Sequence, residues 1–276
     1  MRHSVIFALA VAVPAVLPVL VTQLGATPFI NYADFTSVTD LRLNGTATQN
    51  SSSIQLTGST RANSGSVFVT TRQDVTQDFV ATYKFTLTNP GFTSPNPNTS
   101  NGADGLAFVI TGDSRGPASL GGNGNQIGYG QGPAIQHSVA VAMRTFTFNR
   151  FEIHDNLTNP NYFLPVAPPV ATQSGTLPTM IGTAQTVTVN YLSAPHSLTV
   201  LLNGNSIGLD GVVLPASLSS IVGSNTGYYG FTAATGGNWV TTNLNSFTVT
   251  SVPEPASLAL LALGSLALCR RRREGI

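Results

Sequence analysis

The chain has 276 residues, and only 8% of them are charged, whereas a soluble domain usually has about a quarter. Between the ends, roughly from residue 27 to residue 252, seven basic residues stand against nine acidic ones, although the formal net charge of the whole chain is +1. This balance leaves no basic surface for a polyanion and excludes nucleic acid as an electrostatic partner. The only cysteine, Cys269, lies near the C-terminus, so the body has neither a disulfide framework nor a cysteine-based zinc site.

The first 26 residues have the pattern of a secretory signal peptide. A basic start is followed by an apolar run from Val5 to Val21, and Ala26 is a plausible cleavage point. An uncleaved membrane anchor is the alternative, because a run of about 17 residues reaches the lower limit for a membrane span. Pro14 and Pro18 inside the run favour the signal peptide. We therefore expect residues 1–26 to form a signal helix that is removed on export.

The body, residues 27–251, alternates between apolar and polar residues with a period of two. From Asp78 to Asn89 it reads DFVATYKFTLTN, with Phe79, Ala81, Tyr83, Phe85 and Leu87 on one face. This pattern predicts a half-buried antiparallel strand. Four further segments repeat the enrichment in β-branched and aromatic residues: 138–148, 186–192, 197–204 and 246–251. Asn203-Gly204 predicts a tight hairpin turn, and no run in the body has a convincing helical period. We expect one all-β domain made of two facing sheets.

The body lacks the residue patterns of common enzymes. Its glycine-rich segment SLGGNGNQIGYGQG has no lysine and no following helix, both of which a phosphate-binding loop requires. Glu152 is the only glutamate of the body, so the paired carboxylates of a retaining glycosidase at alternate strand positions are missing. Histidines are present, but Gly-x-Ser-x-Gly is not. We expect no enzymatic activity.

Five segments resemble the legume (L-type) lectin family: LRLNGTA, ADGLAFVI, GGNGNQIGYG, SVAVAMRTF and GFTAATGG. ADGLAFVI (103–110) and GFTAATGG (230–237) occur in the order of that family and are the most specific of the five. The resemblance implies a concanavalin-like jelly-roll β-sandwich and carbohydrate binding without covalent chemistry.

The resemblance also implies which residues would line a sugar pocket. The Asp of the ADG segment maps to Asp104, which would follow a cis peptide bond, and a backbone N–H would fall at Gly124 or Asn125. The last loop of the pocket would be Gly236, Gly237, Asn238 and Trp239. A carboxylate accepts hydrogen bonds from two sugar hydroxyls, and an indole packs on the C–H face of a sugar. The alternatives are a turn-capping role for Asp104 and a packed edge position for Trp239.

The strand that carries the metal ligands in that family departs from the pattern. Where the family has VAVEFDTF, this chain has VAVAMRTF, so that Ala142 replaces the Glu and Arg144 the Asp. Calcium is possible in a lectin, but these ligands are missing, and we expect no cofactor. Arg144 could instead place a fixed positive charge there and hold Asp104 or the loop backbone. The cluster of Glu152, His154 and Asp155 is either a displaced metal site or a solvated strand end.

The C-terminal segment, residues 252–276, resembles a PEP-CTERM sorting tail. Pro253-Glu254-Pro255 is followed by the apolar ASLALLALGSLAL and by four arginines, Arg270, Arg271, Arg272 and Arg273. Thirteen apolar residues are few for a stable span, and arginines stay in the cytoplasm. The resemblance implies a short apolar helix, transient retention in the inner membrane, cleavage by an exosortase and release to the cell surface or extracellular matrix. An ordinary tail anchor is the alternative.

Two functions remain open from the sequence. The first is an exported, metal-independent lectin-like protein that binds a polysaccharide or glycan of the bacterial surface or matrix. The second is a structural protein of the surface or matrix that has the lectin fold but no longer binds sugar.

Overall fold

The computed structural model describes residues 28–93, 101–146, 149–156 and 169–252. Several predicted features lie outside the described residues: the signal helix 1–26, the short C-terminal apolar helix, and the sorting residues Pro253, Glu254, Pro255, Arg270, Arg271, Arg272 and Arg273. Within the described ranges, no helix is long and apolar enough to span a membrane.

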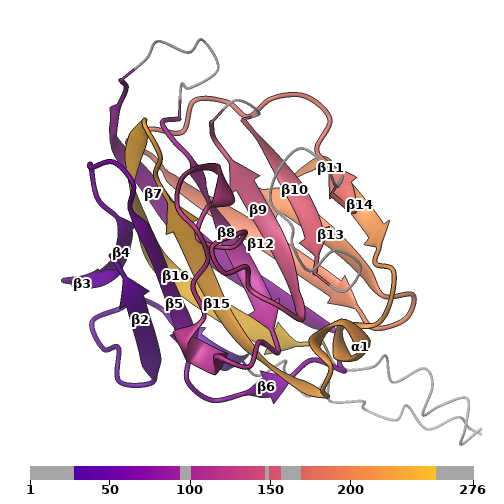
Figure 1. Ribbon diagram of the computed structural model, residues 1–276. Helices are drawn as coiled ribbons and strands as arrows, with labels where there is room; N and C mark the ends of the chain where they lie inside the picture. Colours follow the sequence, from indigo (N-terminus) through magenta and orange to yellow (C-terminus); the bar gives the residue numbers. More distant parts are fainter. Residues whose placement is uncertain (1–27, 94–100, 147–148, 157–168, 253–276) are drawn as a thin grey trace, which may run out of the picture. The chain divides into compact units, whose positions relative to one another are not determined.

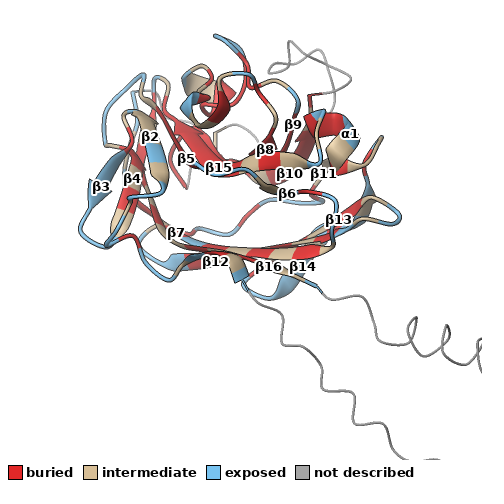
Figure 2. Ribbon diagram, turned by 90° about the horizontal axis from the view of Figure 1, so that it is seen from below, coloured by how far each residue is buried: buried red, intermediate tan, exposed pale blue. Residues whose placement is uncertain are grey.

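Residues 28–252 form the all-β sandwich that the sequence predicts, with two antiparallel sheets as two layers (Figures 1 and 2). The back sheet has eight strands among the described residues. In spatial order they are β14 (Asn205–Val213), β13 (Ser197–Leu202), β12 (Ala184–Leu192), β7 (Phe79–Gly91), β16 (Trp239–Ser251), β4 (Ser53–Thr57) and β3 (Thr48–Asn50), with β1 (Pro28–Tyr32) also paired with β16.

The front sheet also has eight strands in the part of the chain that the structure describes. In spatial order they are β11 (Ala171–Thr172), β10 (Arg150–Asp155), β9 (Ser138–Arg144), β8 (Gly105–Thr111), β15 (Thr226–Ala234), β5 (Ser64–Val69) and β2 (Leu41–Gly45), with β6 (Gln73–Asp74) also paired with β15. Long-range pairs such as β8 with β15 bring segments more than 100 residues apart into direct contact.

The core between the sheets follows from the alternation in the sequence. In β7 the predicted inward face is buried, and it includes Tyr83. The ring of Tyr83 lies 4.9 Å from that of Phe231 on β15, which in turn lies 4.8 Å from Phe247 on β16 at an interplanar angle of 88°. Edge-to-face pairs of this kind add to the free energy gained by burying the rings. They join the two sheets through their central strands.

The front sheet is buried on both faces, which the period-two pattern does not indicate. Every residue of β8 and β9 is buried. A second apolar cluster on the outer face packs Phe68, Val109 and Ala140 against Ile127 and Tyr129 of the segment between β8 and β9. The glycine-rich segment therefore folds back over the front sheet as a cover, and it includes the short 3-10 helices η1 (Gly116–Ala118) and η2 (Gly124–Gln126).

Two local features of the body bear on the predictions. The hairpin at Asn203-Gly204 is confirmed, because both residues have positive φ (51° and 79°) and join β13 to β14. The all-β prediction holds, and the described part of the body contains one short helix, α1 (Leu218–Val222), a single turn capped by the Ser217 side chain. A segment of five residues is too short to show a helical period.

Candidate functional site

The candidate site is built around Asp104, at the edge where β8 begins. The Ala103–Asp104 peptide bond is cis, as the resemblance to lectins implies. The Asp104 N–H donates to the carbonyl of Ala234 at the end of β15, and its carbonyl accepts from the Thr145 N–H after β9. These bonds fix the backbone of Asp104 between the ends of two neighbouring strands.

Asp104, Gly124 and Gly236 converge although they are far apart in the sequence. A Cβ atom built on Gly236 would lie 2.9 Å from Asp104 Oδ2 and 3.2 Å from the Cα of Gly124. Only glycine at 236 lets this loop approach the carboxylate so closely. The structure thus brings together one residue from each of the three segments that the sequence analysis assigns to a sugar pocket.

The carboxylate of Asp104 is buried but only partly satisfied. Asp104 is 5% exposed, and its Oδ2 has no hydrogen-bond partner. Burial raises the pKa of Asp104 from 3.8 to about 7, against the opposing effects of the Gly236 backbone N–H and the charge of Arg144. Asp104 therefore has one acceptor oxygen without a hydrogen-bond partner. The charge of its carboxyl group changes near neutral pH.

A backbone hydrogen bond of Gly124 and the side chain of Arg115 anchor the glycine-rich segment. The Gly124 N–H donates to the carbonyl of Thr235, so one of the two predicted backbone donors is engaged within the fold. Farther along, Arg115 forms an ion pair of 2.6 Å with Asp113 and donates to the carbonyls of Leu120 and Ala134. Burial raises the pKa of Asp113, but the bonds from Arg115 and from the backbone outweigh it and lower that pKa.

The last part of the predicted pocket turns toward the back sheet. Asn238 is buried, and its Oδ1 accepts a hydrogen bond of 2.8 Å from the Thr93 N–H. The Trp239 indole packs on Gly91, where an added Cβ would lie 2.1 Å from its Cε2. Gly237 is exposed beside them. Asn238 and Trp239 thus hold the loop to β7, while Gly236 faces Asp104.

A buried ionic cluster lies beside Asp104 on the outer face of the front sheet. Glu152 and His154 are each 1% exposed, and the His154 ring Nε2 lies 3.0 Å from Glu152 Oε2. Arg150 donates to Glu152 Oε1 at 2.9 Å, and Arg144 Nη1 lies 3.5 Å from Glu152 Oε2. The alternative of a solvated strand end is wrong for Glu152 and His154, which are buried, whereas Asp155 at the end of β10 is half-buried.

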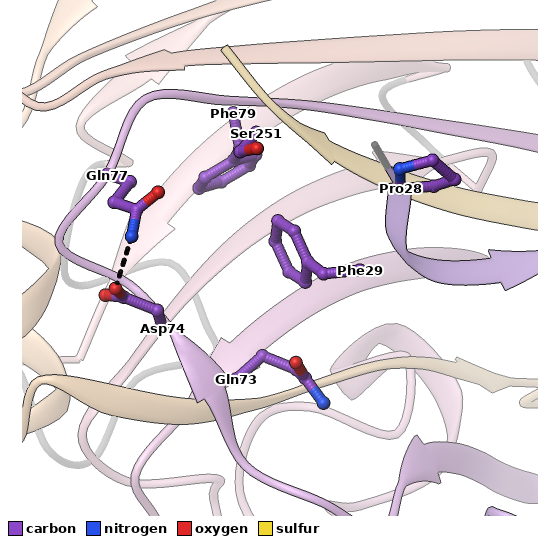
Figure 3. Close-up of a pocket in the computed structure, with 7 residues that line it drawn as sticks. All are labelled: Pro28, Phe29, Gln73, Asp74, Gln77, Phe79 and Ser251. Atoms are coloured by element: carbon purple, nitrogen blue, oxygen red, sulfur yellow. Dashed lines mark hydrogen bonds between the residues drawn. The ribbon is translucent and has the colours of Figure 1, made fainter. Parts of the chain in front are cut away.

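A separate cavity of about 380 Å³ lies at the other end of β15. β15 begins beside β6 at Thr226 and ends beside Gly105, so the cavity is a strand length away from Asp104. Its lining residues are Pro28, Phe29, Gln73, Asp74, Gln77, Phe79 and Ser251 (Figure 3). Figure 3 shows the Phe29 ring facing this space and Gln77 bonded to Asp74. None of the predicted site residues lines it.

The comparisons with known proteins agree with this architecture. The legume lectin domain matches residues 28–260. The chain belongs to the legume lectin family. The PEP-CTERM protein-sorting motif matches residues 251–273, which indicates export through exosortase sorting. No curated protein matches the chain.

Several solved lectin structures share the fold of this family member. A lectin from Bauhinia forficata in complex with GalNAc has a TM-score of 0.63 at 21% identity, over 82% of this chain and 98% of its own. Arcelin-5, a lectin-like defense protein from Phaseolus vulgaris, has a TM-score of 0.59 at 20% identity, over 83% and 99%. The exoplasmic/lumenal domain of VIP36 in a Ca²⁺/Man3GlcNAc-bound form has a TM-score of 0.57 at 15% identity, over 82% and 89%.

The residues of this family member do not fit the cation that its relatives imply. Ala142 has no ligand atom, and the residue opposite it on β10 is Glu152, whose carboxylate is engaged by Arg144, Arg150 and His154. Within the described ranges, no three His, Cys, Asp or Glu side chains are grouped so that they could hold a metal ion. A guanidinium thus occupies the aligned position where the family has an acidic ligand.

Sequence reasoning missed the role of Glu152. The residue lies 48 positions after Asp104, and β-strand order is not visible in a single sequence. Two features of the sequence together could have indicated it. The strand VAVAMRTF lacks both acidic residues of the family pattern, and the next strand carries the only glutamate of the body.

Proposed function

We propose that this protein is an exported carbohydrate-binding protein of the bacterial cell surface or extracellular matrix. It binds a polysaccharide or glycan through Asp104, the Gly124-Asn125 backbone and the loop from Gly236 to Trp239. The observation that carries the proposal is the unpartnered Oδ2 of Asp104, which lies buried where Gly124 and Gly236 converge beside it. A buried acceptor without a partner costs free energy that a hydrogen-bonding ligand recovers.

The proposed binding needs neither metal nor covalent chemistry. Sugar hydroxyls donate to the carboxylate, and the backbone of the glycine-rich segment supplies a donor in return. An exosortase cleaves the tail near Pro253-Glu254-Pro255 after transient retention in the inner membrane, and the domain is released.

A glycan array tests this proposal with the full-length protein, once with calcium and once with a chelator. We expect binding to the same glycans in both conditions and its loss in Asp104→Asn. Asp40→Asn, which changes an exposed aspartate outside the site, is the matched control and should bind like the wild type. Binding that the chelator removes would contradict the metal-independent assignment.

The second candidate is a structural surface protein with a lectin fold that does not bind sugar. The packing of Trp239 on Gly91 and the buried bonds of Asn238 favour it, because both side chains are engaged within the fold. The absence of binding to any glycan, with and without calcium, would decide for this candidate.

A further inference from the structure

Three buried charged residues, Asp104, Arg144 and Glu152, lie on or next to adjacent strands of the front sheet. Arg144 on β9 is paired in register with Gly105, directly after Asp104, and with Arg150 on β10. Glu152 is two residues along β10 on the same face. Asp104, Arg144 and Glu152 are 5%, 8% and 1% exposed. Their charges therefore interact with little screening by solvent.

Glu152 is a charged partner of Arg144 in this cluster, whereas His154 is neutral. Burial raises the pKa of Glu152, but the bond from His154 and the charge of Arg144 outweigh it and lower that pKa to about 2. Burial also lowers the pKa of His154, so this ring is neutral at pH 7.

Few other charged groups are positioned to act on Asp104. Asp155, at the end of β10, acts on His154 and Tyr129. Arg61 is exposed in the loop whose Ala62 N–H donates to Gly236. The charge that acts on the buried Asp104 carboxylate is that of Arg144.

We propose that Arg144, held by Glu152, is a positioning residue that favours the carboxylate form of Asp104 and so replaces the cation of metal-binding lectins. This inference rests on the proposed function, since it assigns a purpose to the ionised state of Asp104. A neutral Asp104 would carry an O–H that competes with the sugar hydroxyls as a donor. The consequence is that sugar binding depends on pH through Asp104 and does not depend on calcium.

Two readouts on the full-length protein test this role. The first is the pKa of Asp104, followed without sugar by carbon-13 NMR of labelled aspartate carboxyl groups and assigned with Asp104→Asn. The second is the affinity for a glycan that the wild type binds on the array, measured from pH 6 to pH 9.5. The variants are Arg144→Met, which removes the charge but keeps the length, and Arg144→Lys, which keeps the charge. Arg42→Ala, at an exposed arginine of β2, is the control.

We expect Arg144→Met to raise the pKa of Asp104 by about one unit, the lower end of the effect of a nearby opposite charge. At pH 7 the ionised fraction then falls from about one half to about one tenth, and the affinity falls about fivefold. At pH 9.5 the affinity should return to that of the wild type, a recovery that a merely structural role would not produce. Arg144→Lys and Arg42→Ala should keep both wild-type values.

The outcomes separate this inference from the proposed function. An unchanged pKa of Asp104 in Arg144→Met would overturn the role of Arg144, whatever the affinity for sugar. A wild type that binds no glycan at any pH would overturn the proposed function, while the NMR titration would still decide on Arg144. If Arg144→Met does not fold, the wild type decides: a pKa of Asp104 that shifts on addition of calcium or chelator would overturn the inference, and an unchanged pKa in Arg144→Lys would support it.

Discussion

The Asp104→Asn variant should become increasingly more stable than the wild type as the pH rises, and it should lose sugar binding. Asn has the shape of Asp but cannot ionise, so the change removes the buried charge and little else. The pKa of Asp104 is raised by burial from 3.8 to about 7 in the folded protein. Between these two values the folded state binds more protons than the unfolded state.

The sign and size of the effect follow from this difference. The contribution of Asp104 to the free energy of unfolding is fully present below pH 3.8 and is lost as the pH rises to about 7. A shift from 3.8 to about 7 corresponds to about 4 kcal/mol, because each pKa unit is worth about 1.4 kcal/mol. The variant should therefore gain about 4 kcal/mol relative to the wild type between pH 4 and pH 8. Glu152 and His154 titrate in both proteins and cancel in the comparison.

Urea unfolding at a series of pH values measures this difference. The fluorescence of Trp239, the only tryptophan, reports unfolding because its indole packs on Gly91. Asp40→Asn serves again as the control and should follow the wild type at every pH. A difference between Asp104→Asn and the wild type that does not change from pH 4 to pH 8 would refute the assignment of Asp104 as a buried, ionising group.

Three further substitutions test the packing around the site. Arg115→Ala should lower the free energy of unfolding by about 3 kcal/mol, since it leaves the buried carboxylate of Asp113 without its partner, and thermal melts measure the loss. Gly91→Ala should cost about 1–3 kcal/mol and change the fluorescence of Trp239, because the added Cβ overlaps the indole. Phe231→Ala should cost about 3–5 kcal/mol in urea unfolding, since it removes the ring that joins the two sheets.

A control variant or a contradicting result is defined for each of the three substitutions. Gly58→Ala is the matched control for Gly91→Ala, because its added Cβ would be 3.4 Å from its nearest neighbour and should be tolerated. Wild-type stability of the Arg115 variant would show that the glycine-rich segment is anchored elsewhere. A loss below about 1 kcal/mol in the Phe231 variant would show that the ring lies outside the cooperative core.

The sequence was sufficient to predict the fold where the chemistry is local. The alternation from Phe79 to Leu87 depends only on one strand having one buried face, and β7 confirms it. The same rule does not indicate that β8 and β9 are buried on both faces, because the cover consists of the glycine-rich segment between them, which has few apolar residues. The burial of Glu152 and His154 follows from that cover, and therefore could not be predicted from their own strand.

The convergence of Asp104, Gly124 and Gly236 was predictable only through the resemblance to lectins. Nothing in a single strand or loop indicates that residues more than 100 positions apart share one space. The position of Trp239 could not be predicted even with this resemblance. The sequence allows either a sugar contact or a packed edge position for the indole. The structure shows that it packs on Gly91 of the neighbouring strand.

The scarcity of charge gives the few buried charges a large effect on the site. Asp113 and Arg115 anchor the glycine-rich segment, and Arg144, Arg150 and Glu152 lie beside the carboxylate at its edge. In a domain whose surface is mostly hydroxyl and amide groups, no dense field of surface ions competes with these clusters. A cation that dissociates would leave such a site with an unbalanced charge whenever calcium is low. A covalently attached guanidinium cannot dissociate and does not titrate near neutral pH, so the pH response of the site is expected to come from Asp104 alone.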